Sequence, residues 1–346
     1  MPIDISVKES SYEPNNGILG SKLSLLYSGN DINHKMVNTL RRVTFNDIPT
    51  YAFPPELITM TKNTSVFNND YMRNHLSSLP ILDIPSSEND LFYLHPKYWN
   101  NVDYSDGERI THENEIIIDM YINSTNNTQH IMNVTTNDAT IIKNDIKISM
   151  YDTEHPPLLI QLKPGQSFNC HMRSSLSIGE NSDIWAASSN SYYDIDDDTS
   201  QILASYETKG QLHEYEFLIK ACDYVCYKLE ELRSNLNEKV ISGQINKNNN
   251  IIMIYLVDED HTMGELINDT IQDLSTVEYS GFSKPDNLVR LGLIKVKCVD
   301  IHSPIDAFNE ASSILTKKFK HIKQEFIKLH TKDKKDTKDK KTKKTK

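Results

Sequence analysis

The first fifty residues change from an alternating pattern of polar and apolar positions to a helical one. Residues 22–27 (KLSLLY) alternate imperfectly, which is typical of a strand with one buried face. After a Ser-Gly-Asn turn, apolar residues recur every three or four positions and so share one face of a helix: Ile32, Met36, Leu40 and Val43. Asp31 is a candidate N-cap, and Pro49 cannot continue the helical hydrogen bonds. The stretch predicts a strand followed by a short amphipathic helix.

A second stretch repeats this pattern at an offset of 227 residues. Residues 251–256 (IIMIYL) predict a strand, and residues 258–273 predict a helix in which Thr262 and Glu265 form a capping box. At this offset the two stretches share His34 with His261, Met36 with Met263, and an apolar residue at Leu40 and Ile267. Such internal repetition predicts two similar strand-helix-strand units that pack face to face.

Each unit is followed by a long amphipathic helix. The first stripe consists of Leu218, Ala221, Val225, Leu229, Leu232 and Leu236. The second stripe consists of Phe308, Ala311, Leu315, Phe319, Ile322, Phe326 and Leu329. Residues 243–250 lie between the units, are polar and lack periodicity, and therefore predict a linker. Residues 331–346 carry nine Lys and three Asp, which cannot bury a core, so a disordered tail is expected.

The region between the first helix and the first long helix has a different pattern. Its β-rich runs predict strands at 115–123 and 132–136 and a hairpin whose strands cover 158–163 and 166–172. Within residues 63–82, an apolar stripe at helical spacing contains Phe67, Tyr71, Leu79 and either His75 or Leu76, with Asn68 or Asn69 as cap. Residues 86–111 are polar and aperiodic and predict a long loop. Together these elements predict an α+β fold in which the region between the two helices is mostly β.

Composition and charge narrow the possible functions. With 38% hydrophobic residues the chain is globular, and no apolar run approaches the roughly 18 residues that span a membrane, so a soluble protein is expected. The net charge is −11, and removal of the tail with its charge of +6 leaves −17. An acidic body argues against a general nucleic-acid clamp and suits partners with basic faces.

Candidate chemistry is sparse. The four cysteines lack paired CxxC spacing, and Cys222 and Cys226, one helical turn apart, are expected to be buried thiols. Residues 258–261 (DEDH) could suggest a metal hydrolase, but neighbouring side chains at a strand end and a helix start point apart. An acidic loop at 194–198 lacks the offsets of a calcium loop. His75 has no paired acid or nucleophile at a telling spacing. We therefore predict no catalytic residue, metal or cofactor.

Three motifs in the first part of the chain resemble one family. The motif N-x-L-R-R-V, followed by I-P-T, is present as Asn38, Leu40, Arg41, Arg42, Val43, Ile48, Pro49 and Thr50. Residues 63–82 are similar to N-T-S-V followed by H-R-L-G-L-I-P-L, and His75 keeps the histidine position. Residues 177–185 retain Ile178, Gly179 and Trp185 of a further motif. The family comprises the third subunit of eukaryotic RNA polymerase II, its archaeal counterpart and the bacterial alpha subunit.

The second part resembles the partner of that family. Residues 259–267 (EDHTMGELI) are similar to E-D-H-T-L-G-N-L-L of the eleventh polymerase II subunit and its archaeal counterpart. Residues 279–287 match its next motif at Gly281, Phe282 and Pro285. The two patterns occur in order within one chain, as in the fused subunits of large nucleocytoplasmic DNA viruses.

The resemblance implies a non-catalytic assembly platform of a multisubunit DNA-dependent RNA polymerase. Residues 1–50 with 188–242 would form one dimerisation domain, 51–187 an inserted domain, and 251–330 a second dimerisation domain paired with the first. Relatives often carry a four-cysteine metal site in the insert, whereas here only Cys170 lies there. The implied partners are the largest and second-largest subunits and small polymerase subunits, with DNA met only through the complex.

The resemblance also implies site residues. Contacts to other subunits are expected from Asn38, Arg41, Arg42, His75, His261, Thr262 and Gly264. Pairing within the chain is expected from Leu218, Val225, Leu229, Leu232, Leu315, Phe319, Ile322 and Phe326. A viral protein of this kind would work in cytoplasmic viral factories and the virion, and a cellular one in the nucleus. The alternative function is a nucleic-acid binder acting through the Lys-rich tail.

Overall fold

The computed structural model describes residues 3–15, 18–82, 84, 115–196, 199–241, 251–286, 288–299 and 302–344. The predicted loop at 86–111 and linker at 243–250 lie outside these ranges. No helix in the described part is long and apolar enough to cross a membrane.

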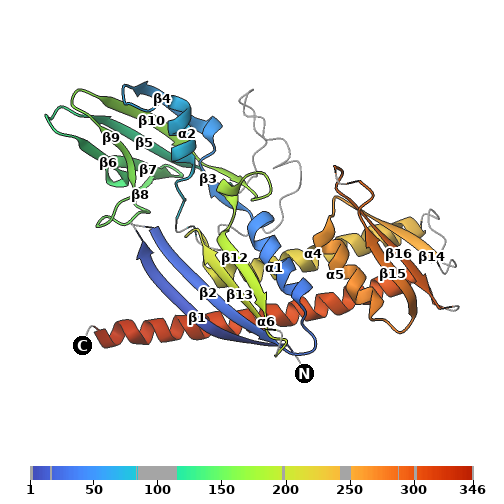
Figure 1. The fold of residues 1–346 in the computed structure, drawn as a ribbon. Helices are drawn as coiled ribbons and strands as arrows, with labels where there is room; N and C mark the ends of the chain where they lie inside the picture. The colour runs from blue at the N-terminus through green and yellow to red at the C-terminus, as the bar shows by residue number, and fades with distance from the viewer. Residues whose placement is uncertain are drawn as a thin grey trace.

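The first sheet has four antiparallel strands in the order β1-β2-β13-β12. They are β1 (Asp4–Asn15), β2 (Ile18–Ser28), β12 (Ser188–Ile195) and β13 (Ile202–Thr208). The predicted strand at 22–27 is therefore the centre of a longer strand, β2. Helix α1 (His34–Asn46) follows β2 and contacts β12 and β13 (Figure 1).

The second sheet has three antiparallel strands in the order β14-β16-β15. They are β14 (Ile251–Val257), β15 (Val277–Ser283) and β16 (Leu291–Cys298), and helix α5 (His261–Gln272) packs on β15 and β16. Helix α1 begins at His34 and α5 at His261, so their starts differ by the 227 residues of the sequence repeat. Each of these helices therefore follows a strand and packs on an antiparallel sheet.

Two long helices run between the sheets. Helix α4 (Glu214–Ile241) packs along α6 (Pro304–Lys344), which runs in Figure 1 from the second sheet across the first. Helix α6 continues to Lys344 and so includes residues 331–344 of the Lys-rich tail. A helix already formed adds residues without a new nucleus, and lysines are favourable near its C-terminus.

The packing of α4 on α6 is antiparallel. Lys323 Nζ lies 2.7 Å from both carboxylate oxygens of Asp223, and Asn309 Nδ2 donates to Asn237 Oδ1 at 3.1 Å. Contacts thus fall earlier on α6 as they fall later on α4: Asp223 meets Lys323, and Asn237 meets Asn309. The helices meet in one large core that also contains α1, α5 and the inner faces of both sheets.

The inserted region has a second core, whose members run from Tyr51 to Ile178. Its five-stranded sheet has the order β4-β10-β5-β7-β8. These strands are β4 (Ile58–Asn63), β5 (Ile118–Thr125), β7 (Ala139–Lys143), β8 (Ile146–Ile148) and β10 (Ser167–Arg173). Smaller pairs are β6 (Met132–Thr135) with β9 (Leu158–Leu162) and β3 (Thr50–Ala52) with β11 (Ser175–Ser177). Short 3-10 helices cover Pro55–Leu57, Thr136–Asp138 and Asp183–Trp185, and helix α2 covers Asn69–Ser77.

For this region one prediction is wrong and another is correct only in part. The strands β9 and β10 do not form a hairpin, because β9 pairs with β6 whereas β10 lies between β4 and β5. The turn between them leads from one sheet to the other: Gly165, at a φ of +78°, donates its N–H to Asn126 at the end of β5. Helix α2 is capped by Asn68, one of the two predicted caps. Of the predicted stripe, Leu76 is buried and Leu79 packs against the second core, but Phe67 and Tyr71 are exposed and Met72 is buried in their place.

Candidate functional site

The N-caps of α1 and α5 occupy equivalent positions in the repeat. Asn33 Oδ1 accepts from the Met36 amide at 3.0 Å, and Asp260 Oδ1 accepts from the Thr262 amide at 2.8 Å. Asn33 and Asp260 are also 227 residues apart. The predicted cap at Asp31 and the predicted capping box of Thr262 with Glu265 are therefore wrong, because the chain enters each helix through the residue just before its histidine.

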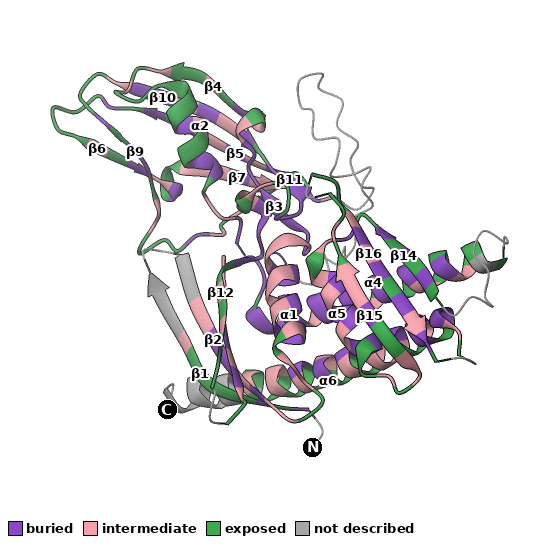
Figure 2. Ribbon diagram, turned by 45° about the vertical axis from the view of Figure 1, so that its right-hand side comes forward, coloured by how far each residue is buried: buried purple, intermediate pink, exposed green. Residues whose placement is uncertain are grey.

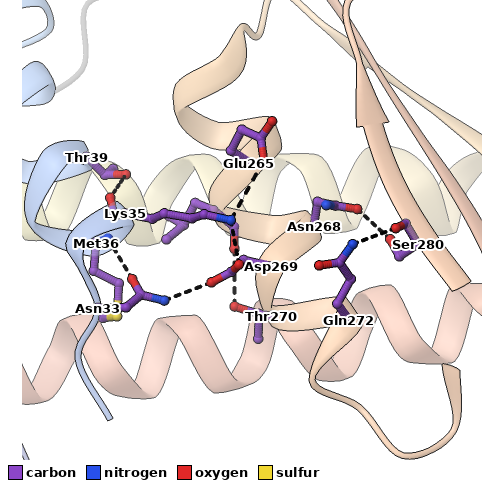
Figure 3. Close-up of polar contacts among 11 residues, drawn as sticks. Asn33, Lys35, Met36, Thr39, Glu265, Asn268, Asp269, Thr270, Gln272 and Ser280 are labelled. Carbon is purple, nitrogen blue, oxygen red and sulfur yellow. Dashed lines mark hydrogen bonds and ion pairs between the residues drawn. The ribbon is translucent and has the colours of Figure 1, made fainter. Parts of the chain in front are cut away.

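Polar groups join α1 to α5 where the two helices cross (Figure 3). Asn33 Nδ2 donates to Asp269 Oδ2 at 2.8 Å, and Lys35 Nζ lies 2.5 Å from Asp269 Oδ1. Lys35 also lies 3.9 Å from Glu265. One carboxylate of α5 therefore receives two donors from the first turn of α1.

A matching contact lies at the other end of the crossing. Arg42 Nη2 donates to Asp260 Oδ2 at 3.1 Å. Adding 227 to Asn33 gives Asp260, and adding 227 to Arg42 gives Asp269. The pairs Asn33–Asp269 and Arg42–Asp260 are therefore exchanged by the repeat, which is the isologous pattern that a two-fold axis produces.

A partly buried polar cluster lies beside this crossing, around a cavity of about 100 Å³. Lys228 of α4 pairs with the buried carboxylate of Glu259 at 2.9 Å, and Arg290, just before β16, pairs with Glu180 from the first part of the chain. Burial raises the pKa of Glu259 against the attraction of Lys228. Both of these ion pairs join a residue from the first part of the chain to one from the second.

Two acids at this site are perturbed in opposite directions. Burial would raise the pKa of Asp260, but the Thr262 amide and the Arg42 guanidinium outweigh it and hold that pKa below its ordinary value. Asp47, at the end of α1, accepts from the Tyr224 hydroxyl at 2.9 Å, and burial raises the pKa of Asp47 to about 7. Asp260 is thus held as a charged partner, whereas Asp47 gains and loses its proton near neutral pH.

The two arginines on α1 that were predicted as contact residues differ in their partners, because only Arg42 forms an ion pair with a described residue. Asn38 Oδ1 accepts from Nε and Nη2 of Arg41 at 3.0 and 2.9 Å. This fixes the direction of the Arg41 side chain, which forms no ion pair with any described residue. Arg42, by contrast, already holds Asp260.

The remaining predicted contact residues lie apart from one another. His75 is exposed on α2 and stacks on Tyr71, with ring centroids 6.2 Å apart. His261 is exposed at the start of α5, with its ring centroid 5.3 Å from that of Phe282. Gly264 is buried, and a Cβ there would lie 2.0 Å from the Phe282 ring. The structure thus gives Gly264 a packing position beneath Phe282 and not an exposed one.

The residues predicted to pair the two parts are all buried in the core that contains α4 and α6. They are Leu218, Val225, Leu229, Leu232, Leu315, Phe319, Ile322 and Phe326. Phe326 also meets Tyr27 of the first sheet edge-on, with ring centroids 6.5 Å apart. Helix α6 therefore reaches across to the core of the first sheet.

Sequence reasoning missed the polar residues of the crossing, namely Asn33, Lys35, Asp269, Lys228, Glu259, Glu180 and Arg290. A signal was present for some of them: at the offset of 227, the basic Arg42 corresponds to the acidic Asp269. In the part of the chain that the structure describes, no three His, Cys, Asp or Glu side chains gather as metal ligands would.

Comparison with known proteins agrees with the motifs. Residues 251–325 match the RNA polymerase Rpb3/Rpb11 dimerisation domain. The chain is 27% identical over 325 residues to a DNA-directed RNA polymerase subunit of Acanthamoeba polyphaga mimivirus, an alignment that covers 87% of this chain and 89% of that protein. The resemblance to polymerase subunits of large DNA viruses, drawn from short motifs, is thereby confirmed.

Proposed function

We propose that this chain, an RNA polymerase subunit with an Rpb3/Rpb11 dimerisation domain, is the non-catalytic assembly platform of a multisubunit DNA-dependent RNA polymerase. Residues 1–50 with 188–242 form one dimerisation half, and residues 251–330 form the other. The platform docks the two largest subunits, which carry the chemistry.

The observation that carries this proposal is the exchange of contacts at the crossing of α1 and α5. Asn33–Asp269 and Arg42–Asp260 are equivalent under the sequence repeat, as expected of a dimer interface enclosed in one chain. Joining the halves covalently raises their effective concentration, so pairing does not depend on two free chains meeting.

Docking of the second-largest subunit is assigned to the exposed side of α1. Arg41 is held by Asn38 and has no acidic partner among the described residues, so its guanidinium can donate to a carboxylate of another chain. Arg42 serves a different purpose, because its partner Asp260 lies within the chain. The motif alone assigns both arginines to one interface. We instead give Arg41 to the docking of another subunit and Arg42 to pairing within the chain.

The test is co-expression of the tagged chain with the cognate second-largest subunit. We expect Arg41→Glu to reduce recovery of that subunit about tenfold, because a carboxylate would then face a carboxylate. The matched control is Arg233→Glu, which reverses a comparably exposed helical arginine on α4. Equal recovery with wild type and Arg41→Glu would show that this face of α1 is not the docking surface.

A further inference from the structure

The two sheets have equivalent strands except at one edge. The order β2-β13-β12 in the first sheet corresponds to β14-β16-β15 in the second, since β2 and β14 each lead into the repeated helix. In the first sheet β1 pairs with the remaining edge of β2. In the second sheet no described strand occupies the corresponding edge of β14, which lies outermost in Figure 1.

The free edge of β14 lacks the features that protect other sheet edges. The outermost strand of the first sheet, β1, contains Lys8, Glu9 and Pro14 and a register shift after Val7. Strand β14 (IIMIYLV) contains no charged residue and no proline, and its pairing with β16 has no register shift. An uncharged, regular edge strand invites pairing with another strand, and folded proteins normally avoid it.

The outer face of β14 is apolar as well. Alternate side chains are exposed by 44% at Ile251, 49% at Met253, 52% at Tyr255 and 57% at Val257. Figure 2 shows exposed and buried positions alternating along β14. A strand that faces water on one side normally carries polar residues there. The apolar face and the unpaired backbone edge therefore coincide on one strand.

We propose that β14 receives an extended segment of another polymerase subunit, which adds a fourth strand in the position that β1 holds in the first sheet. The added strand runs antiparallel to β14, as β1 does to β2, and places alternate apolar side chains beside the exposed ones of β14. This rests on the proposed function, because it supplies the platform with a second docking surface remote from Arg41.

Charge favours a partner segment with an acidic residue. Lys295, the register partner of Met253 on β16, is exposed and forms no ion pair with a described residue, whereas Lys297 already holds Glu278. A carboxylate on the added strand would lie two strands from Lys295, about 9–10 Å away between Cα atoms, and long Glu and Lys side chains can bridge that distance over Met253. A second copy of this chain that paired its own β14 here could not supply this carboxylate, because β14 has no acidic residue.

The test uses the polymerase complex purified through the tagged full chain. A photoreactive phenylalanine derivative replaces Tyr255, and the matched control places it at Ile146, an exposed residue (68%) on another edge strand, β8. We expect position 255 to cross-link to one segment of another polymerase subunit. We also expect Tyr255→Lys, unlike Ile146→Lys, to lower recovery of that subunit about tenfold.

Hydrogen exchange supplies an independent measurement. The β14 amides should exchange more slowly in the complex than in the isolated chain, because the added strand would bond to its free edge. Three results would overturn the added strand when polymerase subunits co-purify: cross-linking only within this chain, cross-linking only to a second copy, or no cross-linking. Each of these results would leave the proposed function standing. If no polymerase subunit co-purifies with the unmodified chain, the proposed function itself fails.

Discussion

The ion pair between Lys35 and Asp269 should be a measurable part of the attachment of α1 to α5. Its side chains are 30% and 27% exposed, and the charged atoms are 2.5 Å apart. Fully exposed pairs contribute about 0.2–1 kcal/mol, whereas hydrogen bonds to charged groups contribute about 1.5–3 kcal/mol. For a pair about three-quarters buried we expect a coupling of about 1 kcal/mol.

The single substitutions should differ. Lys35→Ala leaves Asp269 its bond from Asn33, so a loss of about 1 kcal/mol is expected. Asp269→Ala removes both bonds and leaves Lys35 with only Glu265, at 3.9 Å, so the loss should be about 2 kcal/mol. The difference between the double variant and the sum of the singles gives the coupling.

Native-state hydrogen exchange of the α1 and α5 amides measures these values as opening free energies, which avoids assuming two-state unfolding of a chain with two cores. The control is Lys328 with Glu325, a pair within α6 whose lysine is 68% exposed, with an expected coupling below about 0.5 kcal/mol. A Lys35–Asp269 coupling no larger than this control would refute the interpretation that the crossing is held by its polar pairs.

Three further predictions concern packing and pH. Gly179→Ala should lower the free energy of unfolding in urea by about 3 kcal/mol, because its Cβ would lie 1.9 Å from the backbone oxygen of Phe45. Gly264→Ala should lower it by only about 1 kcal/mol, because the new Cβ would displace only the Phe282 ring. Phe319→Ala, in the α4–α6 core, should cost about 3–5 kcal/mol and release the tail of α6 to proteolysis; unchanged proteolysis would contradict this. Folded Asp47 keeps its proton to about pH 7 and unfolded Asp47 only to about 3.8, so the free energy of unfolding falls as pH rises between these values. The stability of Asp47→Asn relative to wild type should therefore rise by about 2–3 kcal/mol between pH 5 and 8, and a constant difference would refute the raised pKa.

The sequence predicted a helix and its buried face correctly where the segment had a single apolar stripe that packs on a single core. The stripe of Met36, Leu40 and Val43 is buried as its spacing predicted, and the repeat offset placed the start of α5. At residues 63–82 the same logic was right for Leu76 but wrong for Phe67 and Tyr71, because Phe67 and Tyr71 recur at the same interval as the buried Met72 and Leu76. Periodicity shows that a helix has a stripe, but only the neighbouring sheet decides which stripe is covered.

The site residues were harder to predict because their partners lie far away in sequence. Nothing local to Asp269 indicates Asn33, which is 236 positions earlier. The caps failed for another reason: Asp31 and Asn33 are both good caps, and the backbone path selects between them. The hairpin failed because turn residues show where a chain reverses but not which sheet it then joins.

The repeat would also allow the proposed platform to distinguish two different large subunits. At the offset of 227, Arg41 corresponds to Asn268. Arg41 is partly exposed and has no acidic partner among the described residues, whereas Asn268 is buried and its Oδ1 accepts from Ser280 at 2.6 Å. The equivalent positions thus offer a cation on one side and no accessible polar group on the other. A carboxylate suited to Arg41 would have no counterpart at the second position, so a partner that depends on that contact would bind only the first half.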